Sequence, residues 1–102
     1  MSEFVRVARQ DELPLGSSKE VEVQGRLVAL FNRDGQILAL DGVCPHAGGP
    51  LSEGTIEGTV VTCPWHGWQF DLTTGHNVHN SKCVQQCYPV KTEGGEILLS
   101  LT

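Results

Sequence analysis

The chain has 102 residues, 39% hydrophobic and 19% charged, which is the composition of an ordinary folded domain without room for a second core. Seven basic against twelve acidic residues give a formal charge of −5, which argues against a nucleic-acid surface and suits a basic protein partner. No apolar run approaches the roughly 20 residues of a membrane span, and the first residues lack the apolar core of a signal peptide. We therefore expect a cytoplasmic protein without a membrane or nucleic-acid partner. Its thiols would be reduced, which favours metal binding over disulfides.

Short β-rich stretches recur along the chain between Gly, Pro, Asn and Asp residues, and few stretches keep a helical period. In chain order, the predicted strands cover residues 3–8, 20–24, 26–31, 36–40, 59–62, 88–92 and 97–101. A turn or a single helical turn is expected over residues 10–15. Residues 32–35, with Asp-Gly at the end, and residues 93–96, with Gly-Gly at the centre, carry hairpin signals between consecutive strands. The pattern predicts a single all-β domain, residues 1–102, built from antiparallel strands.

The composition changes between Val43 and Gly75, where six glycines and three prolines occur. Such a stretch is typical of loops whose backbone turns sharply or approaches another group closely. We interpret residues 43–75 as an insertion of loops that carries the functional site. The scaffold beneath it would be formed by strands from both ends of the chain.

Two Cys–His pairs lie inside this insertion, Cys44-Pro45-His46 and Cys63-Pro64-Trp65-His66, with residues 47–62 between them. Thiolate and imidazole groups are metal ligands, and two centres use two of each. The first is a mononuclear tetrahedral zinc site, although zinc fingers usually pair Cys with Cys and His with His. The second is a [2Fe–2S] cluster in which two His replace two Cys on one iron.

These residues resemble the Rieske family, whose motif is Cys-x-His, about 16 residues, and then Cys-x-x-His-Gly. Gly67 completes the second half of the motif, and Phe70-Asp71 and Thr74-Gly75 are also family-like. The resemblance covers nearly the whole chain and implies an antiparallel Rieske-like β-sandwich or barrel with a small cluster-binding subdomain.

The resemblance also implies the ligands of one [2Fe–2S] cluster per chain. Cys44 and Cys63 would bind the inner iron, and His46 and His66 would bind the outer iron through ring nitrogens at an exposed tip. Pro50-Leu51, which follows Gly48-Gly49, resembles the third loop, which shields such clusters from water.

A low reduction potential is expected from four positions in which the chain differs from high-potential Rieske proteins. Those proteins carry a disulfide between the cluster loops and place Ser and Tyr hydroxyls against the sulfurs. Here the disulfide positions hold Gly49 and Trp65, and the hydroxyl positions hold Trp68 and Phe70. Two missing charge-assisted hydrogen bonds correspond to a potential lower by ~130–260 mV, which places the chain near the low end of the Rieske range.

Low-potential Rieske ferredoxins are one-electron carriers, and the resemblance implies that role here. The expected partners are a flavin-dependent ferredoxin reductase and a terminal oxygenase or reductase. The alternative is a small Rieske-fold subunit held by the large subunit of an NAD(P)H nitrite reductase. We expect no enzyme activity of the chain itself, because no open metal position or nucleophile–base pair is evident.

Other chemically distinctive residues have plainer interpretations. Cys83 and Cys87 are predicted to be buried or half-buried free thiols, because an extended C-x₃-C spacing of ~13 Å is too long for a disulfide. His76 and His79 are predicted to be solvated loop residues. Trp68 is expected to pack under the loop, Asp71 to cap or buttress it, and Trp65 has either a surface or a partner-contacting role.

Overall fold

The computed structural model describes residues 4–42, 50–65, 67–79 and 85–100. Within these residues the chain forms strands and two single-turn 3-10 helices. The strands are β1 (Val5–Arg9), β2 (Ser18–Val23), β3 (Arg26–Arg33), β4 (Gln36–Asp41), β5 (Thr55–Glu57), β6 (Val60–Thr62), β7 (Gln69–Asp71), β8 (Cys87–Tyr88), β9 (Val90–Glu93) and β10 (Glu96–Leu99). The helical turns are η1 (Gln10–Glu12) and η2 (Leu51–Glu53). In this part of the chain no helix is long and apolar enough to cross a membrane.

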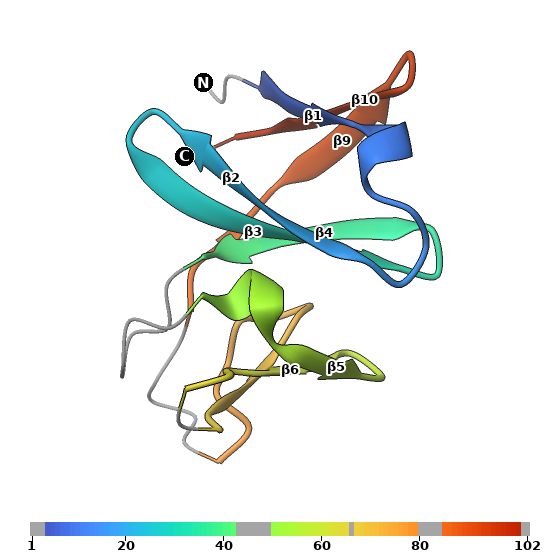
Figure 1. The fold of residues 1–102 in the computed structure, drawn as a ribbon. Coiled ribbons are helices and arrows are strands. Elements are labelled where there is room, and N and C mark those ends of the chain that lie inside the picture. The colour runs from blue at the N-terminus through green and yellow to red at the C-terminus, as the bar shows by residue number, and fades with distance from the viewer. Residues whose placement is uncertain (1–3, 43–49, 66, 80–84, 101–102) are drawn as a thin grey trace.

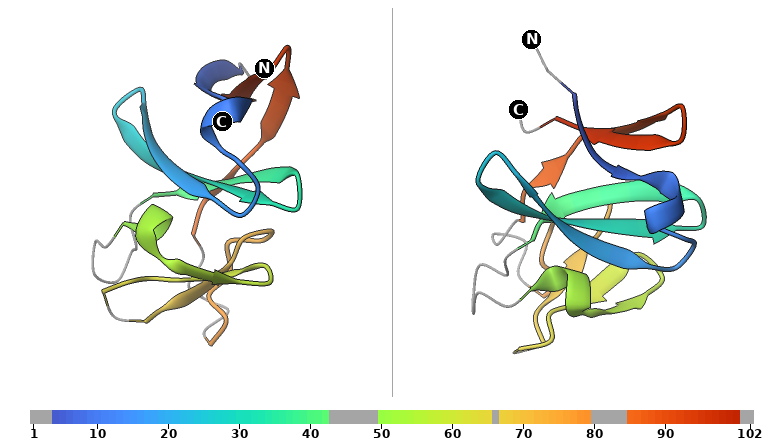
Figure 2. Two further views of the ribbon diagram at one scale, coloured as in Figure 1. Left: turned by 45° about the vertical axis from the view of Figure 1, so that its right-hand side comes forward. Right: turned by 45° about the horizontal axis from the view of Figure 1, so that its top comes forward.

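The strands form three antiparallel sheets, with strand orders β1-β10-β9, β2-β3-β4-β8 and β5-β6-β7. In Figure 1 the first sheet lies at the top, the four-stranded sheet in the middle and the β5-β6-β7 sheet at the bottom, and both views of Figure 2 keep this order. We call the first two sheets the base and the third the small sheet. The all-β antiparallel prediction is confirmed.

Strand β3 lies between two hydrophobic cores, because its successive side chains point to opposite faces. Val28 and Leu30 enter the core of the base, whereas Ala29 and Phe31 enter a second core shared with the small sheet. All four side chains are fully buried. The continuous apolar run of β3 therefore reflects burial on both faces.

The two predicted hairpin turns are confirmed. Asp34 and Gly35 connect β3 to β4 with φ angles of 55° and 91°, the left-handed pair that a two-residue hairpin turn requires. Gly94 and Gly95 connect β9 to β10 in the same way, with φ angles of 56° and 81°.

The predicted strand over residues 88–92 is wrong in one respect, because the chain changes sheets within it. Strand β8 pairs with β4, whereas β9 pairs with β10, and Pro89 lies between them. Proline has no N–H for a sheet ladder, so it marks the crossing point. The crossing joins the two sheets of the base.

The insertion over residues 43–75 contains two strands that the sequence did not predict. Of its strands only the one near 59–62 was predicted, and β5 and β7 pair with it on either side to complete the small sheet. Each of the three is three residues long and lies next to a glycine or a turn, so neither flanking strand gives a clear alternating pattern.

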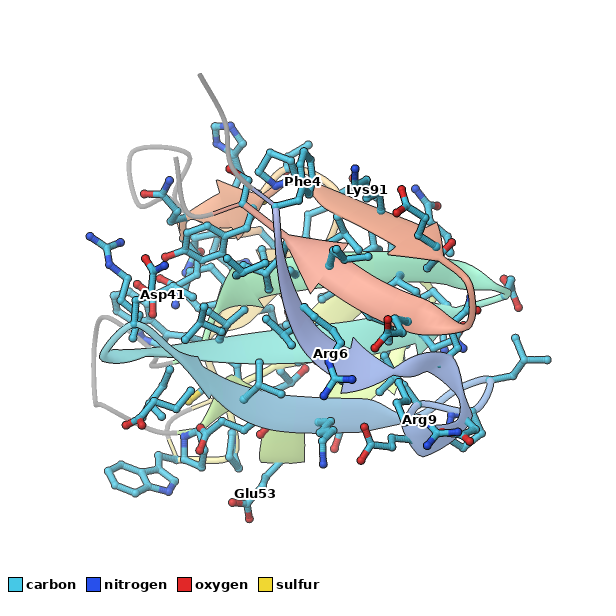
Figure 3. The ribbon with its side chains drawn as sticks, turned by 90° about the horizontal axis from the view of Figure 1, so that it is seen from above. Phe4, Arg6, Arg9, Asp41, Glu53 and Lys91 are labelled. Carbon is cyan, nitrogen blue, oxygen red and sulfur yellow. The ribbon has the colours of Figure 1, made fainter. Side chains whose placement is uncertain are left out.

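Two hydrogen bonds from side chains dock this region on the base. The Ser18 hydroxyl of β2 donates to the Ser52 carbonyl in η2 at 2.5 Å. The Arg33 Nε of β3 donates to the Gly58 carbonyl in the β5–β6 turn at 2.7 Å. At the opposite end of the molecule, Lys91 Nζ lies 4.8 Å from the centre of the Phe4 ring (Figure 3).

Candidate metal centre

Cys63 is the predicted ligand that the structure describes in full. It follows β6 directly, and its side chain is only 1% exposed. It belongs to the core between the base and the small sheet, together with Leu51 and Phe70. The core residues around the Cys63 thiol therefore shield it from water.

The loop that begins at Cys63 is closed by two backbone hydrogen bonds. The Cys63 N–H donates to the Trp68 carbonyl at 2.7 Å, and the Gly67 N–H donates to the Cys63 carbonyl at 3.1 Å. Gly67 has a φ of +76°, which favours glycine at the return of the chain. Pro64 and Trp65 are exposed, Trp65 to 59%. The loop therefore has a buried cysteine at its root and a solvent-exposed tip.

The first predicted ligand pair lies between two described anchors. Gly42 follows the last residue of β4 and precedes this pair in the sequence. Its carbonyl accepts a hydrogen bond from the Leu51 N–H at 3.0 Å. The Gly42 N–H donates to the Leu27 carbonyl at 2.8 Å, and a Cβ at Gly42 would lie 3.1 Å from that carbonyl group. The two ends of this segment are thus held together and fixed to β3.

Cys44, His46 and His66 themselves lie outside the described residues, as does Cys83. Among the residues that the structure describes, no three His, Cys, Asp or Glu side chains gather closely enough to hold a metal ion. The predicted ligand set therefore stays a prediction, with Cys63 as its described member.

The surroundings of Cys63 fit a cluster of the predicted type. The sulfur is the soft ligand that iron–sulfur chemistry requires, and it sits on an apolar core formed by Leu51 and Phe70. The short loop exposes its tip, where an outer iron would need access to a partner. The position of Cys63 is therefore suited to the inner iron of a [2Fe–2S] group.

The turn after β7 buttresses this region, as predicted for Asp71. Asp71 Oδ1 accepts hydrogen bonds from the Thr73 N–H at 2.8 Å and from the Thr73 hydroxyl at 2.5 Å. These hydrogen bonds, the hydroxyl first, hold the pKa of Asp71 below its usual value. The Asp71 carbonyl accepts from the Gly75 N–H at 2.7 Å, which closes the turn.

The two aromatic residues of the second loop differ in exposure. Trp68 is half-buried and its ring lies 6.4 Å from that of Phe70, tilted by 42°, so the predicted packing role is confirmed. Trp65 points to solvent, and its contact with a partner remains a prediction. Phe70 is fully buried at the predicted position of a missing hydroxyl.

The predictions for His76, His79 and Cys87 are confirmed where the structure describes them. Both histidines are exposed, and His79 Nε2 lies 3.1 Å from Gln69 Oε1. Cys87 is a half-buried free thiol. Burial, and secondly the charge of Asp71, raise the pKa of Cys87, so the thiol stays protonated at neutral pH.

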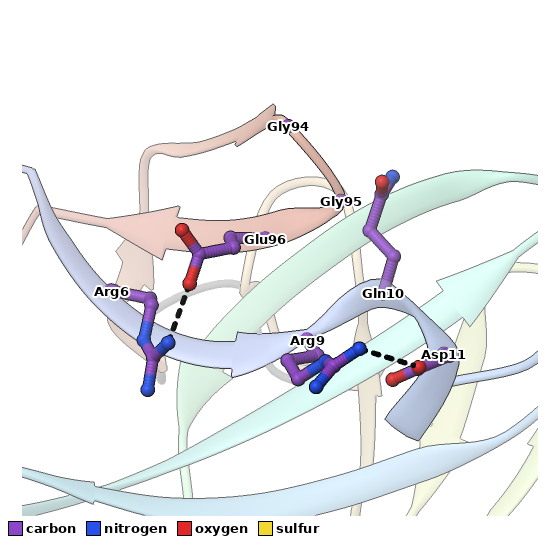
Figure 4. A pocket seen from close by; sticks show the side chains of 7 residues that line it. All are labelled: Arg6, Arg9, Gln10, Asp11, Gly94, Gly95 and Glu96. Carbon is purple, nitrogen blue, oxygen red and sulfur yellow. Dashed lines mark hydrogen bonds and ion pairs between the residues drawn. The ribbon is translucent and has the colours of Figure 1, made fainter.

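Two hollows mark the described surface at opposite ends. One of about 240 Å³ adjoins the second loop and is lined by Gly67, Trp68, Asn77 and His79. The other, of about 410 Å³, lies beside β1 and the β9–β10 turn. Its two arginines are paired, Arg6 with Glu96 at 2.6 Å and Arg9 with Asp11 at 3.2 Å (Figure 4). That pairing leaves no uncompensated cation in the larger hollow.

Sequence reasoning missed the role of Gln85, which is 4% exposed and is hydrogen-bonded to the end of β4 and to the turn that follows β7. It also missed the role of Gly54, where a Cβ would lie 2.2 Å from the Thr62 carbonyl oxygen. The crowding of glycines signalled close approach in general. It did not signal which chain segments approach each other.

Comparison with known proteins gives the chain a family. The profile of the Rieske [2Fe-2S] domain matches residues 3–92. The ferredoxin component of the naphthalene 1,2-dioxygenase/salicylate 5-hydroxylase systems of Ralstonia sp. is 32% identical over 99 residues, which cover 96% of this chain and 95% of that protein.

Solved structures agree on the fold. A chain from the complex of reduced oxygenase and oxidised ferredoxin in carbazole 1,9a-dioxygenase superposes with a TM-score of 0.84 at 28% identity, over 95% of this chain and 92% of that one. A protein from Mycobacterium tuberculosis assigned as the small subunit of an NADH-dependent nitrite reductase gives 0.91 at 24% identity, over 100% and 97%. The second match speaks for the fold alone. The chain belongs to the Rieske [2Fe-2S] domain family, and its cofactor is a single [2Fe–2S] cluster.

Proposed function

We propose that this protein is the ferredoxin component of an oxygenase system. It receives single electrons from a flavin-dependent ferredoxin reductase and passes them to a terminal oxygenase. The observation that carries the proposal is the loop from Cys63 to Trp68, which has a buried thiol at its root and an exposed tip. The similarity to a ferredoxin component over nearly the full length of both chains supports the same role.

The proposed ligands are Cys44 and Cys63 on the inner iron and His46 and His66 on the outer iron. The proposed unit is one domain, residues 1–102, with a cluster-binding subdomain over about 43–75. The bound cluster supplies a one-electron couple. Leu51 and Phe70 exclude water from the Cys63 side, and the backbone bonds at the loop root keep the thiol in place.

The charge of this half of the chain supports a basic partner surface. Between Arg33 and Lys82 the sequence contains no Lys or Arg, but it contains five acidic residues. Of these, Glu53 and Glu57 are exposed and Asp71 is half-buried on or beside the small sheet. A positively charged partner surface is therefore attracted to the half that carries the proposed ligands, and salt weakens the attraction. We place the protein in the cytoplasm, where its partners would be.

The second candidate function is that of the small subunit of a nitrite reductase. It rests on a structural likeness at 24% identity, which supports the fold only. A stable complex with a nitrite reductase large subunit, together with no electron transfer to any oxygenase, would favour it over the ferredoxin role.

The proposal is tested by cluster content and electron acceptance. Purified protein is expected to hold about two iron and two acid-labile sulfides per chain, and to accept one electron from NADH through a flavin-dependent ferredoxin reductase. Cys63→Ser is expected to lose the cluster, whereas the matched variant Cys87→Ser keeps it, because Cys87 is a half-buried thiol on β8, outside the two loops that carry the proposed ligands. Colourless protein with one bound zinc, or equal bleaching of both variants, would contradict the proposal.

A further inference from the structure

Two described segments lead out of the four-stranded sheet and back into it. The first is Asp41–Gly42, at the end of β4, and the second is Gln85–Gln86, directly before β8. They lie side by side, because the Asp41 N–H donates a hydrogen bond to the Gln86 carbonyl at 2.8 Å. The position of the cluster-bearing half relative to the base depends on this pair of segments.

Gln85 bonds to both sides of the crossing. Its side-chain Nε2 donates to the Asp41 carbonyl at 2.7 Å, and its backbone N–H donates to the Gly75 carbonyl at 2.6 Å. The residue is only 4% exposed, so these bonds are made away from bulk water. A buried polar side chain with such contacts joins the end of β4 to the turn that follows β7.

Gly75 makes the close approach possible. It has a φ of +79°, and a Cβ there would lie 2.0 Å from the Gln85 carbonyl oxygen and 3.0 Å from Cys87 Sγ. Any larger residue at Gly75 would push the turn after β7 away from the segment before β8. The turn that contains Gly75 is also hydrogen-bonded to Asp71 of β7. Strand β7 pairs with β6, and β6 leads directly into Cys63.

We propose that Gln85 is a positioning residue that sets the spacing between the two cluster-binding loops. The proposal rests on the ligands proposed above, Cys44 and Cys63. Cys44 follows Asp41 by three positions, and Cys63 is reached from Gly75 through the paired strands β7 and β6. Iron–ligand distances tolerate changes of only about 0.2 Å, so a cluster held between two loops responds to small shifts of either root.

The test separates the hydrogen bond from simple packing. Gln85→Met keeps the length of the side chain and removes the donor to Asp41, and Gln86→Met alters its exposed neighbour as the matched control. Each purified holoprotein is challenged with an excess of an iron chelator, and loss of the visible absorption is timed. The EPR spectrum of the reduced protein is recorded in parallel.

Gln85→Met is expected to lose its cluster about 5- to 150-fold faster than the wild type, because a buried acceptor without its donor costs on the order of 1–3 kcal/mol. Its EPR signal is expected to broaden as the loop spacing becomes variable. Gln86→Met is expected to match the wild type in both measurements. Release rates and EPR spectra of Gln85→Met equal to those of Gln86→Met would overturn the proposal.

Gly75→Ala tests the same contact from the other side and serves if Gln85→Met does not fold. It is expected to accelerate cluster loss and broaden the EPR signal in the same way, and a wild-type response would overturn the proposal. The outcome is distinct from failure of the proposed function. Wild-type protein without iron defeats the cluster assignment, whereas a stable cluster that ignores both substitutions defeats only the role of Gln85.

Discussion

The two hydrophobic cores of this protein share strand β3 but are built differently. The core of the base is enclosed by strands of four to eight residues and by the two-residue β8, and its buried members are aliphatic apart from Tyr88. The core beneath the small sheet is enclosed by β3 and β4 on one side and by strands of three residues on the other, and Cys63 is among its buried members. The base has long ladders, whereas the cluster-side core combines the short ladders of the small sheet with a proposed metal ligand, Cys63.

The difference teaches which half depends on the cofactor. In the base, six residue pairs join β2 to β3 and six join β3 to β4. In the small sheet, β6 has three pairs with each neighbour. A sheet this small is marginal by itself, so we expect packing on β3 and the proposed bond from Cys63 to iron to contribute much of its stability.

The largest expected effect comes from neighbouring residues on the shared strand. Phe31→Ala opens a cavity in the cluster-side core and is expected to lower the free energy of unfolding by about 3–5 kcal/mol. Leu30→Ala opens one in the base and is expected to cost about 2–5 kcal/mol. Only Phe31→Ala is expected to accelerate iron release in the folded protein, which urea unfolding and a chelator assay measure separately. Equal acceleration by both substitutions would show that the two cores act as one.

An intermediate effect is expected on the reduction potential. Phe70→Tyr places a hydroxyl in the cluster-side core, where a hydrogen bond to a cysteine sulfur stabilises the more negative reduced state. A gain of roughly 1.5–3 kcal/mol raises the midpoint potential by ~65–130 mV. Redox titration of both proteins measures the shift. The wild-type midpoint is expected near −150 mV, at the low end of the range, and a value above about +100 mV would refute the low-potential assignment.

The smallest effect concerns the turn after β7 and its pH dependence. The folded-state pKa of Asp71 lies below its usual value, so its contribution to stability is present above the unfolded pKa of about 3.9. That contribution is lost as the pH falls through the lower folded pKa. At neutral pH, Asp71→Asn is expected to lower the free energy of unfolding by about 0.5–1.5 kcal/mol, the value of one ordinary hydrogen bond.

Urea unfolding at pH 7 and near pH 3 tests this sign. The difference between wild type and Asp71→Asn is expected to shrink at the acidic pH. A difference that grows under acid would contradict the assigned role of the carboxylate. Asp34→Asn, in the exposed β3–β4 turn, is the control in the base.

The base was largely predictable because its chemistry is local. Val21 and Val23 alternate with exposed glutamates in β2, and Asp34-Gly35 and Gly94-Gly95 encode their own turns. The sheet change at Pro89 was missed because residues 88–92 resemble one continuous β-rich stretch, and only the pairing partners of β8 and β9 distinguish the two strands.

The residue types of the candidate site could be proposed from the sequence, but the contacts that hold its loops in place could not. The spacing of Cys44, His46, Cys63 and His66 predicts a ligand set, which stays a prediction, and Cys63 is its described member, with a buried side chain. The side-chain hydrogen bond of Gln85 joins residues 44 positions apart in sequence, so no local sequence pattern predicts it. The short strands β5 and β7 depend on the same long-range packing.

The uneven charge along the chain has a practical consequence for voltammetry. The five acidic residues between Arg33 and Lys82 have no Lys or Arg in the same stretch to balance them, whereas Arg6, Arg9 and Lys91 on the far sheet are each paired with a carboxylate. The negative charge of the molecule is therefore concentrated at one end. An electrode coated with amine groups would attract the acidic half of the protein. The proposed iron site would then face the electrode surface. A carboxylate-coated electrode would repel the acidic half, so the base would face the surface and its added thickness would slow electron exchange.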